Sequence, residues 1–331
     1  MAAQELLTGE HLILTMSLNL KEKVYGFIFG GAIGDALGLG TEFMSVAEVR
    51  RRYPAGLQSY HQIVQDAHRS QWDRGDWTNN TEVLLRLIES IIDKGDIDIH
   101  DFARVLVDWF ITNPVDVVPQ VRCVVSQPDY LDDPIGVALR MWEKMGHHNA
   151  SNEALQRAIL CGAWEKDNPE KRVADVCRIT HPDTRCSCAA SILAHISHSL
   201  IYEDRLLSRD EIMAIANRID RRVAPYIEAA DNPDISTLKL DDRQTLWYVR
   251  KCMACALWAL RHTDNPSNAL DAIVMAGGDA DTNGAVAMNL VGMRDGYSAL
   301  PPTLIQGLLQ RERLDDIAAR FYPIFEKRVN G

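Results

Sequence analysis

The segment 21–39 carries glycine at every fourth position, at Gly26, Gly30, Gly34 and Gly38. Residues four apart lie on one face of an α-helix, so this spacing predicts a helix with one bare face. A glycine inside a helix costs about 1 kcal/mol relative to alanine. Such a cost needs a reason, and close approach of another backbone supplies one. The spacing therefore predicts a helix against which a second segment packs without intervening side chains.

Apolar residues recur at helical spacing through most of the chain. In the segment 78–94 the i, i+3, i+4 pattern is carried by Val83, Leu84, Leu87, Ile88, Ile91 and Ile92. Comparable patterns predict further helices at 100–112, 134–147, 151–163, 172–180, 185–202, 211–229, 243–262, 302–309 and 314–326, and another that starts at Pro266. The stretch 113–133 reads as irregular. No stretch alternates as a half-buried strand does. These patterns predict one all-α domain over residues 21–331, preceded by an N-terminal extension or arm, residues 1–20.

Composition excludes several classes of function. The chain has 331 residues, with 35 basic against 46 acidic side chains, and its net charge of −11 argues against nucleic-acid or anionic-membrane binding. No apolar run approaches the roughly 18–20 residues that span a bilayer. The first residues lack the basic and apolar parts of a secretory signal. Seven cysteines are few for this length and favour a reducing compartment. We therefore expect a cytoplasmic protein.

Two close cysteine pairs, Cys186/Cys188 and Cys252/Cys255, have the residue type of a zinc site. Both pairs lie in apolar stretches that are expected to be helical. Cysteine in such surroundings usually packs as a small hydrophobic side chain. Core packing is the favoured interpretation, and zinc is the alternative.

The segment Gly277–Gly284 reads Gly-Gly-Asp-Ala-Asp-Thr-Asn-Gly between two apolar runs. Its glycines allow a tight turn or a positive φ. Alternate oxygens from Asp279 and Asp281 could converge on a hard divalent cation. Alternatively, the same polar side chains cap the helix that follows. This segment alone does not separate the two interpretations.

Two further polar clusters interrupt apolar helices, Asp35 with Glu42 and the segment Thr78–Thr81. Both lie at or near expected helix ends, as the Gly277–Gly284 segment does. Helical proteins build metal sites from inward-facing oxygen side chains on different helices. We therefore expect these clusters to face each other around a pair of divalent ions.

Ordered motifs along the chain resemble the ADP-ribosylglycohydrolase superfamily, which includes ADP-ribosylarginine hydrolases and dinitrogenase-reductase-activating glycohydrolases. Gly30–Gly38 followed by Glu42 resembles the family's opening helix, and Trp77–Thr81 resembles its Thr-Asp-Asp-Thr motif. Pro114–Val117 resembles its Pro-x-Asp-Ile-Gly segment. Ser151–Leu155 with Arg157 resembles its Asn-Gly-Ala-Leu-Met-Arg segment. The remaining matches are Thr180–Pro182, similar to a Thr-His motif, and Gly277–Gly284, similar to the second metal motif.

The resemblance implies a compact, orthogonal multi-helix bundle that hydrolyses the N-glycosidic bond between ADP-ribose and a protein side chain, arginine above all. It implies two Mg²⁺ or Mn²⁺ ions, with Glu42 and Asp116 positioning or activating water. The implied metal ligands are Thr78, Asn79, Asn80, Asp279, Asp281 and Thr282. The implied contacts to the ADP-ribosylated protein substrate come from Ser151, Asn152, Gly277, Gly278 and Asn283.

The chain departs from the family pattern at the implied metal site. Asn79 and Asn80 stand where the family has aspartates, so two ligand charges are missing, and Val118 and Glu153 stand where it has glycines. Because the affinity of a hard cation depends on ligand charge, these changes predict weakened or absent metal binding and low turnover. The two asparagines are either natural or engineered substitutions, and the sequence does not separate these origins.

Two alternatives to hydrolysis of an ADP-ribosylated protein follow from the same motifs. One is a catalytically weak protein, ADP-ribose-binding or immunity-type, that antagonises an ADP-ribosyltransferase toxin through its N-terminal extension, residues 1–20. The other is a hydrolase of a small N-glycosidic metabolite.

Overall fold

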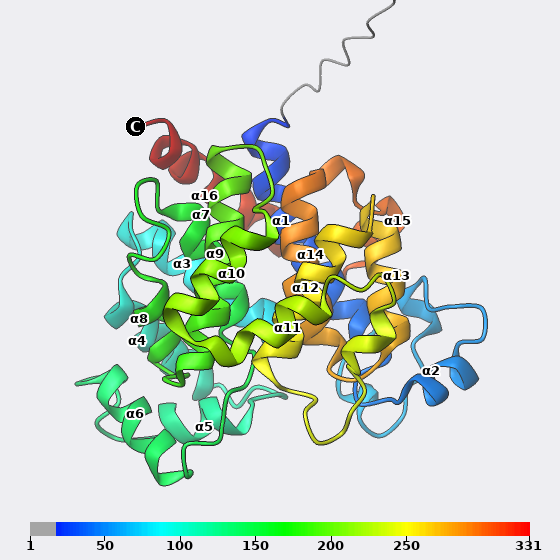
Figure 1. Cartoon of the computed structure of the whole chain (residues 1–331), viewed down its shortest axis with the longest axis horizontal. Helices are drawn as coiled ribbons and strands as arrows, with labels where there is room; N and C mark the ends of the chain where they lie inside the picture. The colour runs from blue at the N-terminus through cyan, green and yellow to red at the C-terminus, as the bar shows by residue number, and fades with distance from the viewer. Residues whose placement is uncertain (1–17) are drawn as a thin grey trace, which may run out of the picture.

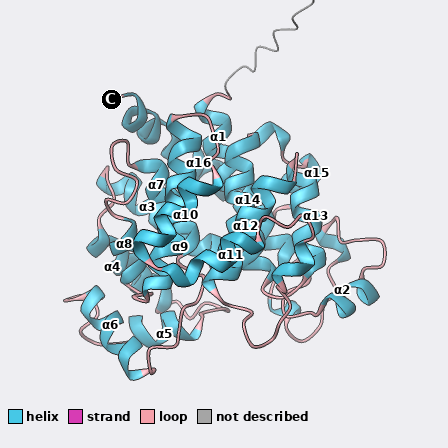
Figure 2. Ribbon diagram, viewed as in Figure 1, coloured by secondary structure: helices cyan, strands magenta, loops and turns pink. Residues whose placement is uncertain are grey.

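The computed structural model describes residues 18–331, and in this part of the chain all regular structure is helical (Figures 1 and 2). The one β-type pairing there is an isolated bridge between Ser151 and Tyr248. The all-α prediction is confirmed. None of the helices described is long and apolar enough to cross a membrane. The predicted extension lies almost wholly outside the described residues, and so does its predicted contact with a toxin.

The described residues form sixteen α-helices joined by short turns and a few 3-10 turns. In chain order the helices are α1 Leu20–Gly38, α2 Val46–Arg52, α3 Asn79–Lys94, α4 Ile99–Phe110, α5 Pro119–Val125, α6 Pro134–Lys144, α7 Leu155–Trp164, α8 Val173–Arg178, α9 Thr184–Tyr202, α10 Arg209–Ile219, α11 Ala224–Ala229, α12 Val249–His262, α13 Pro266–Ala276, α14 Ala280–Asp295, α15 Pro302–Gly307 and α16 Arg311–Asn330.

Local sequence signals set several helix ends as predicted. Ser45 and Glu48 form a reciprocal capping box at the start of α2, in which each side chain satisfies a backbone N–H of the other residue. Gly95 ends α3 in the left-handed region, with φ of 76°. Asn265 caps α13 and is followed by Pro266 in the first turn, where a missing N–H does no harm.

Four predicted boundaries are wrong. The helix expected over 243–262 begins only at Val249. The stretch read as irregular contains α5, a seven-residue helix with Pro119 in its first turn. The helix expected over 211–229 is broken at Asp220, whose carboxylate caps a 3-10 turn before Pro225 helps to open α11. A proline cannot continue a helix because it lacks the N–H and clashes with the preceding turn. The helix expected from residue 151 begins only at Leu155. Ser151 instead pairs with Tyr248, the residue just before α12, in an isolated β-bridge.

The glycine face of α1 packs against α14, and the two helices run side by side through the centre of the molecule (Figure 1). A Cβ atom placed on Gly34 would lie 2.2 Å from the carbonyl oxygen of Gly284, and one placed on Gly26 would lie 2.0 Å from that of Gly292. Gly30 and Gly38 meet Met288 and Ala280 in the same way. The backbone contact predicted from the glycine spacing is therefore confirmed.

The pairing of α1 with α14 is antiparallel, because positions advance along one helix as they recede along the other. It places Asp35, near the end of α1, beside Asp281, in the first turn of α14. Both helices are buried on nearly all sides. Asn289 locks the contact by donating a hydrogen bond of 2.7 Å to the carbonyl oxygen of Phe27. This central pair fixes where the polar ends of the two helices meet.

We expect Gly34→Ala to destabilise the protein by more than about 3 kcal/mol, although alanine favours an ordinary helix by about 1 kcal/mol. The new Cβ would meet backbone atoms of Gly284 and Ala285, which cannot rotate away. Urea denaturation measures the free energy of unfolding. Gly95→Ala is the matched control, because no atom lies within 4 Å of its Cβ position and only the positive φ is strained. Equal losses in the two variants would contradict the packing argument.

Candidate active site and metal centre

The Gly277–Gly278 turn brings Glu42 to the start of α14. Both glycines have positive φ, 64° and 74°. A Cβ on Gly277 would lie 2.3 Å from the carbonyl oxygen of Met44, so the turn requires glycine there. The N–H of Phe43 donates to the carbonyl of Gly278 at 2.6 Å, and the N–H of Gly278 donates to that of Met44 at 2.9 Å. These two bonds tie the segment after α1 to the segment before α14.

The capped-helix interpretation of this turn is wrong. The N-cap position of α14 is Asp279, and its side chain makes no capping hydrogen bond. Asp281, Thr282 and Asn283 lie inside the first turns of the helix and are buried. Their polar groups are therefore available to the interior of the molecule.

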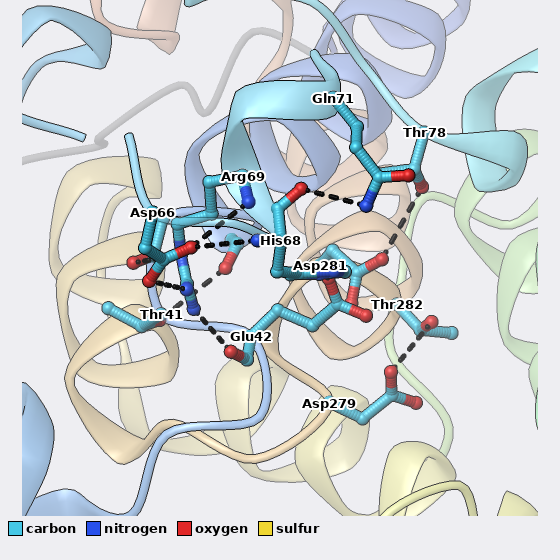
Figure 3. Close-up of polar contacts among 12 residues, drawn as sticks. Thr41, Glu42, Asp66, His68, Arg69, Gln71, Thr78, Asp279, Asp281 and Thr282 are labelled. Atoms are coloured by element: carbon cyan, nitrogen blue, oxygen red, sulfur yellow. Dashed lines mark hydrogen bonds and ion pairs between the residues drawn. The ribbon is translucent and has the colours of Figure 1, made fainter. Parts of the chain in front are cut away.

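Three buried carboxylates, from Glu42, Asp279 and Asp281, converge at this point (Figure 3). Each contributes an oxygen, and these oxygens all lie within 4.8 Å of one another. Asp279 accepts hydrogen bonds from Asn152 at 2.6 Å and from Thr282 at 3.2 Å. One oxygen of Asp281, Oδ1, is buried without any hydrogen-bond partner. A buried carboxylate oxygen without a donor is costly, which marks this position as one that suits a cation.

The start of α3 faces the same carboxylates. Thr78 is the N-cap of α3, and its hydroxyl accepts from the N–H of Asn80 at 3.3 Å. The side-chain amide of Asn80 donates to Oδ2 of Asp281 at 3.0 Å. The hydroxyl of Thr282 donates to Oδ1 of Asn80 at 3.4 Å. Asn79 stands beside this contact, with its Oδ1 3.3 Å from the Thr78 hydroxyl. The structure thus brings together all six residues of the implied ligand set.

Asp35 holds the start of α3 in place. Its carboxylate accepts from the N–H groups of Thr78 and Thr81, at 3.2 and 2.9 Å, and from their hydroxyls, at 2.8 and 2.6 Å. Burial outweighs these donors and raises the pKa of Asp35 to about 6. The sequence grouped Asp35 with Glu42, but Asp35 anchors a helix terminus whereas Glu42 faces the other carboxylates.

His68 contacts Glu42 and was not found from the sequence. Its Nε2 lies 2.7 Å from Oε2 of Glu42, and this hydrogen bond raises the pKa of His68 (Figure 3). The neighbouring Arg69 is buried and donates to the carbonyl oxygens of Gly40 and Glu42. Both residues belong to the stretch 55–76, which has no periodic pattern. No spacing signal could have connected them to Glu42.

Asp116 lies in the loop before α5, half-buried, at the wall of a cavity of about 340 Å³. Thr78 and Asn79 line the same cavity. Burial first, and then the negative charges of Glu42 and Asp35, raise the pKa of Asp116 to about 6. The cavity therefore connects Asp116 with the start of α3.

The implied substrate contacts lie around the same point. Asn152 reaches Asp279 through its Nδ2, and its Oδ1 is buried without a partner. Both polar side-chain atoms of Asn283 are buried without partners as well. Ser151 precedes Asn152 and forms the isolated β-bridge with Tyr248. Its hydroxyl oxygen lies 3.0 Å from Nε2 of His181. Counting Oδ1 of Asp281, four buried amide and carboxylate atoms of Asn152, Asp281 and Asn283 thus have no hydrogen-bond partner.

The electrostatics of the site favour a bound cation. Burial and the neighbouring carboxylates raise the pKa values of Asp279 and Asp281 above their usual range. A divalent ion would lower both, and carboxylate, amide and hydroxyl oxygens are the ligands that Mg²⁺ and Mn²⁺ prefer. Within residues 18–331, Glu42, Asp279 and Asp281 are the one group of His, Cys, Asp or Glu side chains arranged to hold an ion. The cysteines of the zinc alternative are buried thiols in helices, as core packing predicts.

The all-helical fold and the cluster of buried oxygen ligands are those of a helical protein with a metal site between its helices. The family model of the ADP-ribosylglycohydrolases matches residues 16–330, and the chain belongs to that family. An ADP-ribosylarginine hydrolase, Tri1, of Serratia proteamaculans (strain 568) is 25% identical over 91% of this chain and 79% of its own length. An ADP-ribosyl-[dinitrogen reductase] glycohydrolase of Rhodospirillum rubrum is 27% identical over 86% and 89%.

The solved structure of an ADP-ribosylglycohydrolase-related protein complex has the same fold. It superposes with a TM-score of 0.71 over 92% of this chain and 98% of its own, at 21% identity.

We expect Asp279→Asn to stabilise the metal-free protein. The pKa of Asp279 is raised to about 8, so the folded state binds this proton more tightly than the unfolded state. Stability in the presence of a chelator should therefore fall as the pH rises from about 4 toward 8. Asp279→Asn removes this fall and should raise Tm at pH 8 by at least about 2–4 °C. Asp93→Asn, at an exposed position of α3, is the control. A lower Tm for Asp279→Asn at pH 8 would contradict this account.

Proposed function

We propose that the protein hydrolyses the N-glycosidic bond that links ADP-ribose to arginine side chains of proteins. The observation that carries the proposal is the convergence of Glu42, Asp279 and Asp281, with the unpaired Oδ1 of Asp281 among them. The family membership and the names of the relatives support the same reaction class.

In the proposed hydrolysis Glu42 acts as the general base and Asp116 as the general acid. His68 orients Glu42, which takes a proton from the attacking water. Asp116, whose pKa is raised to about 6, carries a proton to the departing nitrogen of the guanidine. Positive charge develops on the ribose as the bond to nitrogen breaks, and the surrounding carboxylates stabilise it. The water oxygen ends on the anomeric carbon, and the bonding electron pair leaves with the nitrogen.

The remaining polar groups of the site bind and orient the nucleotide. Asp279, Asp281, Thr282 and the residues at the start of α3 would hold a Mg²⁺ or Mn²⁺ ion, and its positive charge would help to orient the ribose hydroxyls. The unpaired Oδ1 of Asn152 can accept hydrogen bonds from the sugar hydroxyls, and the unpaired Nδ2 of Asn283 can donate to the diphosphate. The N–H groups at the start of α14 offer a further anion contact.

Two exposed aromatic rings at the mouth of the site favour arginine as the acceptor. Phe43, next to Glu42, is 40% exposed, and Trp247 is 49% exposed. Their ring centroids are 6.0 Å apart in an edge-to-face arrangement. Phe43 has a positive φ of 61°, a strained conformation for a bulky residue, and its N–H is bonded to Gly278. A planar, cationic guanidinium stacks on such rings, and the nearby carboxylates attract it.

We expect the protein to release ADP-ribose from an arginine-modified protein slowly and only with Mg²⁺ or Mn²⁺. Asn79→Asp/Asn80→Asp should raise the rate at least about tenfold, because it adds two ligand charges. Glu42→Gln should lower it at least about a hundredfold, because it removes the base. Chromatography of free ADP-ribose measures the release, and Glu143→Gln, at an exposed position, is the control. If the double-Asp form releases no ADP-ribose, the proposed reaction is wrong.

We expect Trp247→Ala to raise KM for an ADP-ribosylarginine substrate by about two- to fivefold, the equivalent of about 0.5–1 kcal/mol of cation–π attraction at an exposed site. KM for an ADP-ribosylserine substrate should change less, because serine carries no guanidinium. Leu309→Ala, at another exposed apolar position, should change neither value. An equal rise for both substrates would assign Trp247 to the nucleotide rather than to the acceptor.

A further inference from the structure

Glu153 places an additional carboxylate beside the two asparagines. It lies in the turn before α7, and its side chain is 9% exposed. One small cavity, of about 10 Å³, is lined by Asn79, Asn80, Val83, Leu106, Trp109, Val121, Glu153 and Arg157. A cavity of this size has room for about one water molecule. Glu153 and the two asparagines therefore line the same space, together with apolar side chains and one guanidinium.

Hydrogen bonds behind Glu153 determine its charge. The hydroxyl of Thr180 lies 2.7 Å from Nδ1 of His181 and accepts a bond from Arg157. A guanidinium only donates, and that of Arg157 also lies 3.4 Å from Nδ1 of His181, so Nδ1 accepts. Nε2 of His181 therefore carries the proton, 2.8 Å from Oε2 of Glu153. The imidazole is neutral, and burial lowers the pKa of His181 accordingly.

The negative charge of Glu153 consequently stays on its carboxylate. The nearest guanidinium, that of Arg157, is directed to the Thr180 hydroxyl and to the carbonyl oxygen of Cys177. No ion pair joins it to Glu153 among the described residues. A histidine that donates to a carboxylate from behind also fixes its orientation, as partners of metal ligands do.

We propose that Glu153 supplies the divalent-metal site with the negative charge that Asn79 and Asn80 lack, facing the ion directly or through the one water that the cavity holds. The inference rests on the proposed function only in taking Mg²⁺ or Mn²⁺ as the ion. At the start of α3 every candidate ligand is neutral, whereas hard cations require anionic oxygen. Glu153 is the carboxylate on the far wall of the same cavity. The carboxylate of Glu153, in the turn before α7, thus replaces negative charge that Asn79 and Asn80 of α3 do not supply.

The test is a double-mutant cycle on Mn²⁺ affinity, measured by titration calorimetry and by the electron paramagnetic resonance of free Mn²⁺. The four proteins are the full-length chain, Glu153→Gln, Asn79→Asp/Asn80→Asp, and the combination of all three substitutions. Glu153→Gln should weaken Mn²⁺ binding at least about tenfold in the original chain. In the Asn79→Asp/Asn80→Asp protein, where the charge is already present, it should weaken binding less than about threefold.

Two further variants separate charge from structure. Glu153→Asp keeps the charge and should retain most of the affinity, whereas Glu143→Gln, at an exposed position, should change nothing. If Glu153→Gln does not fold, Glu153→Ala takes its place, because water can then reach His181.

Three outcomes overturn the proposal. These are an unchanged affinity in Glu153→Gln, an equal loss in both backgrounds, and Mn²⁺ binding by Asn79→Asp/Asn80→Asp in the absence of binding by the original chain. The last outcome would leave the proposed hydrolysis intact. Failure of every variant, including Asn79→Asp/Asn80→Asp, to bind Mn²⁺ would count against the metal-dependent reaction itself.

Discussion

The direct backbone contact between α1 and α14 determines where the chemistry of this protein takes place. Side chains normally separate packed helices by 8–10 Å, but glycines at Gly26, Gly30, Gly34 and Gly38 remove that spacer. The contact runs to the very end of α1 and the very start of α14. The polar residues that follow one helix and open the other consequently meet, and little freedom remains in their relative position.

A second contact of the same kind extends this arrangement. Gly277 and Gly278 let the chain after α1 lie against the chain before α14, with reciprocal backbone hydrogen bonds to Phe43 and Met44. Asp35 then draws the start of α3 toward the pair by accepting from four donors of Thr78 and Thr81. Carboxylates that repel one another are held together by backbone geometry and by the helix terminus that Asp35 anchors. Burial first, and then this repulsion, raise the pKa values of Asp279 and Asp281.

The sequence predicted the parts of this arrangement that depend on local spacing. Helical periodicity, capping boxes and the glycine face are short-range signals, and the structure follows them at α1, α2 and α3. The partner of the glycine face could not be derived in the same way. The two helices α1 and α14 are about 240 residues apart, and the glycine spacing does not specify which other helix packs against it. His68 was missed as a site residue for a related reason. It reaches Glu42 from an irregular segment, where tertiary contacts alone decide the direction of a side chain.

The hydrogen bond from Asn80 to Asp281 gives the site an internal competitor for its ion. The amide donates to Oδ2 of Asp281, one of the oxygens available to an ion, and an aspartate at position 80 could not make this bond. A hydrogen bond to a charged group contributes about 1.5–3 kcal/mol, which corresponds to roughly ten- to a hundredfold in a dissociation constant. An ion that takes this oxygen must displace the amide first. Asn80 therefore has two effects on ion binding: it supplies no negative charge, and its amide occupies an oxygen of Asp281 that an ion would use.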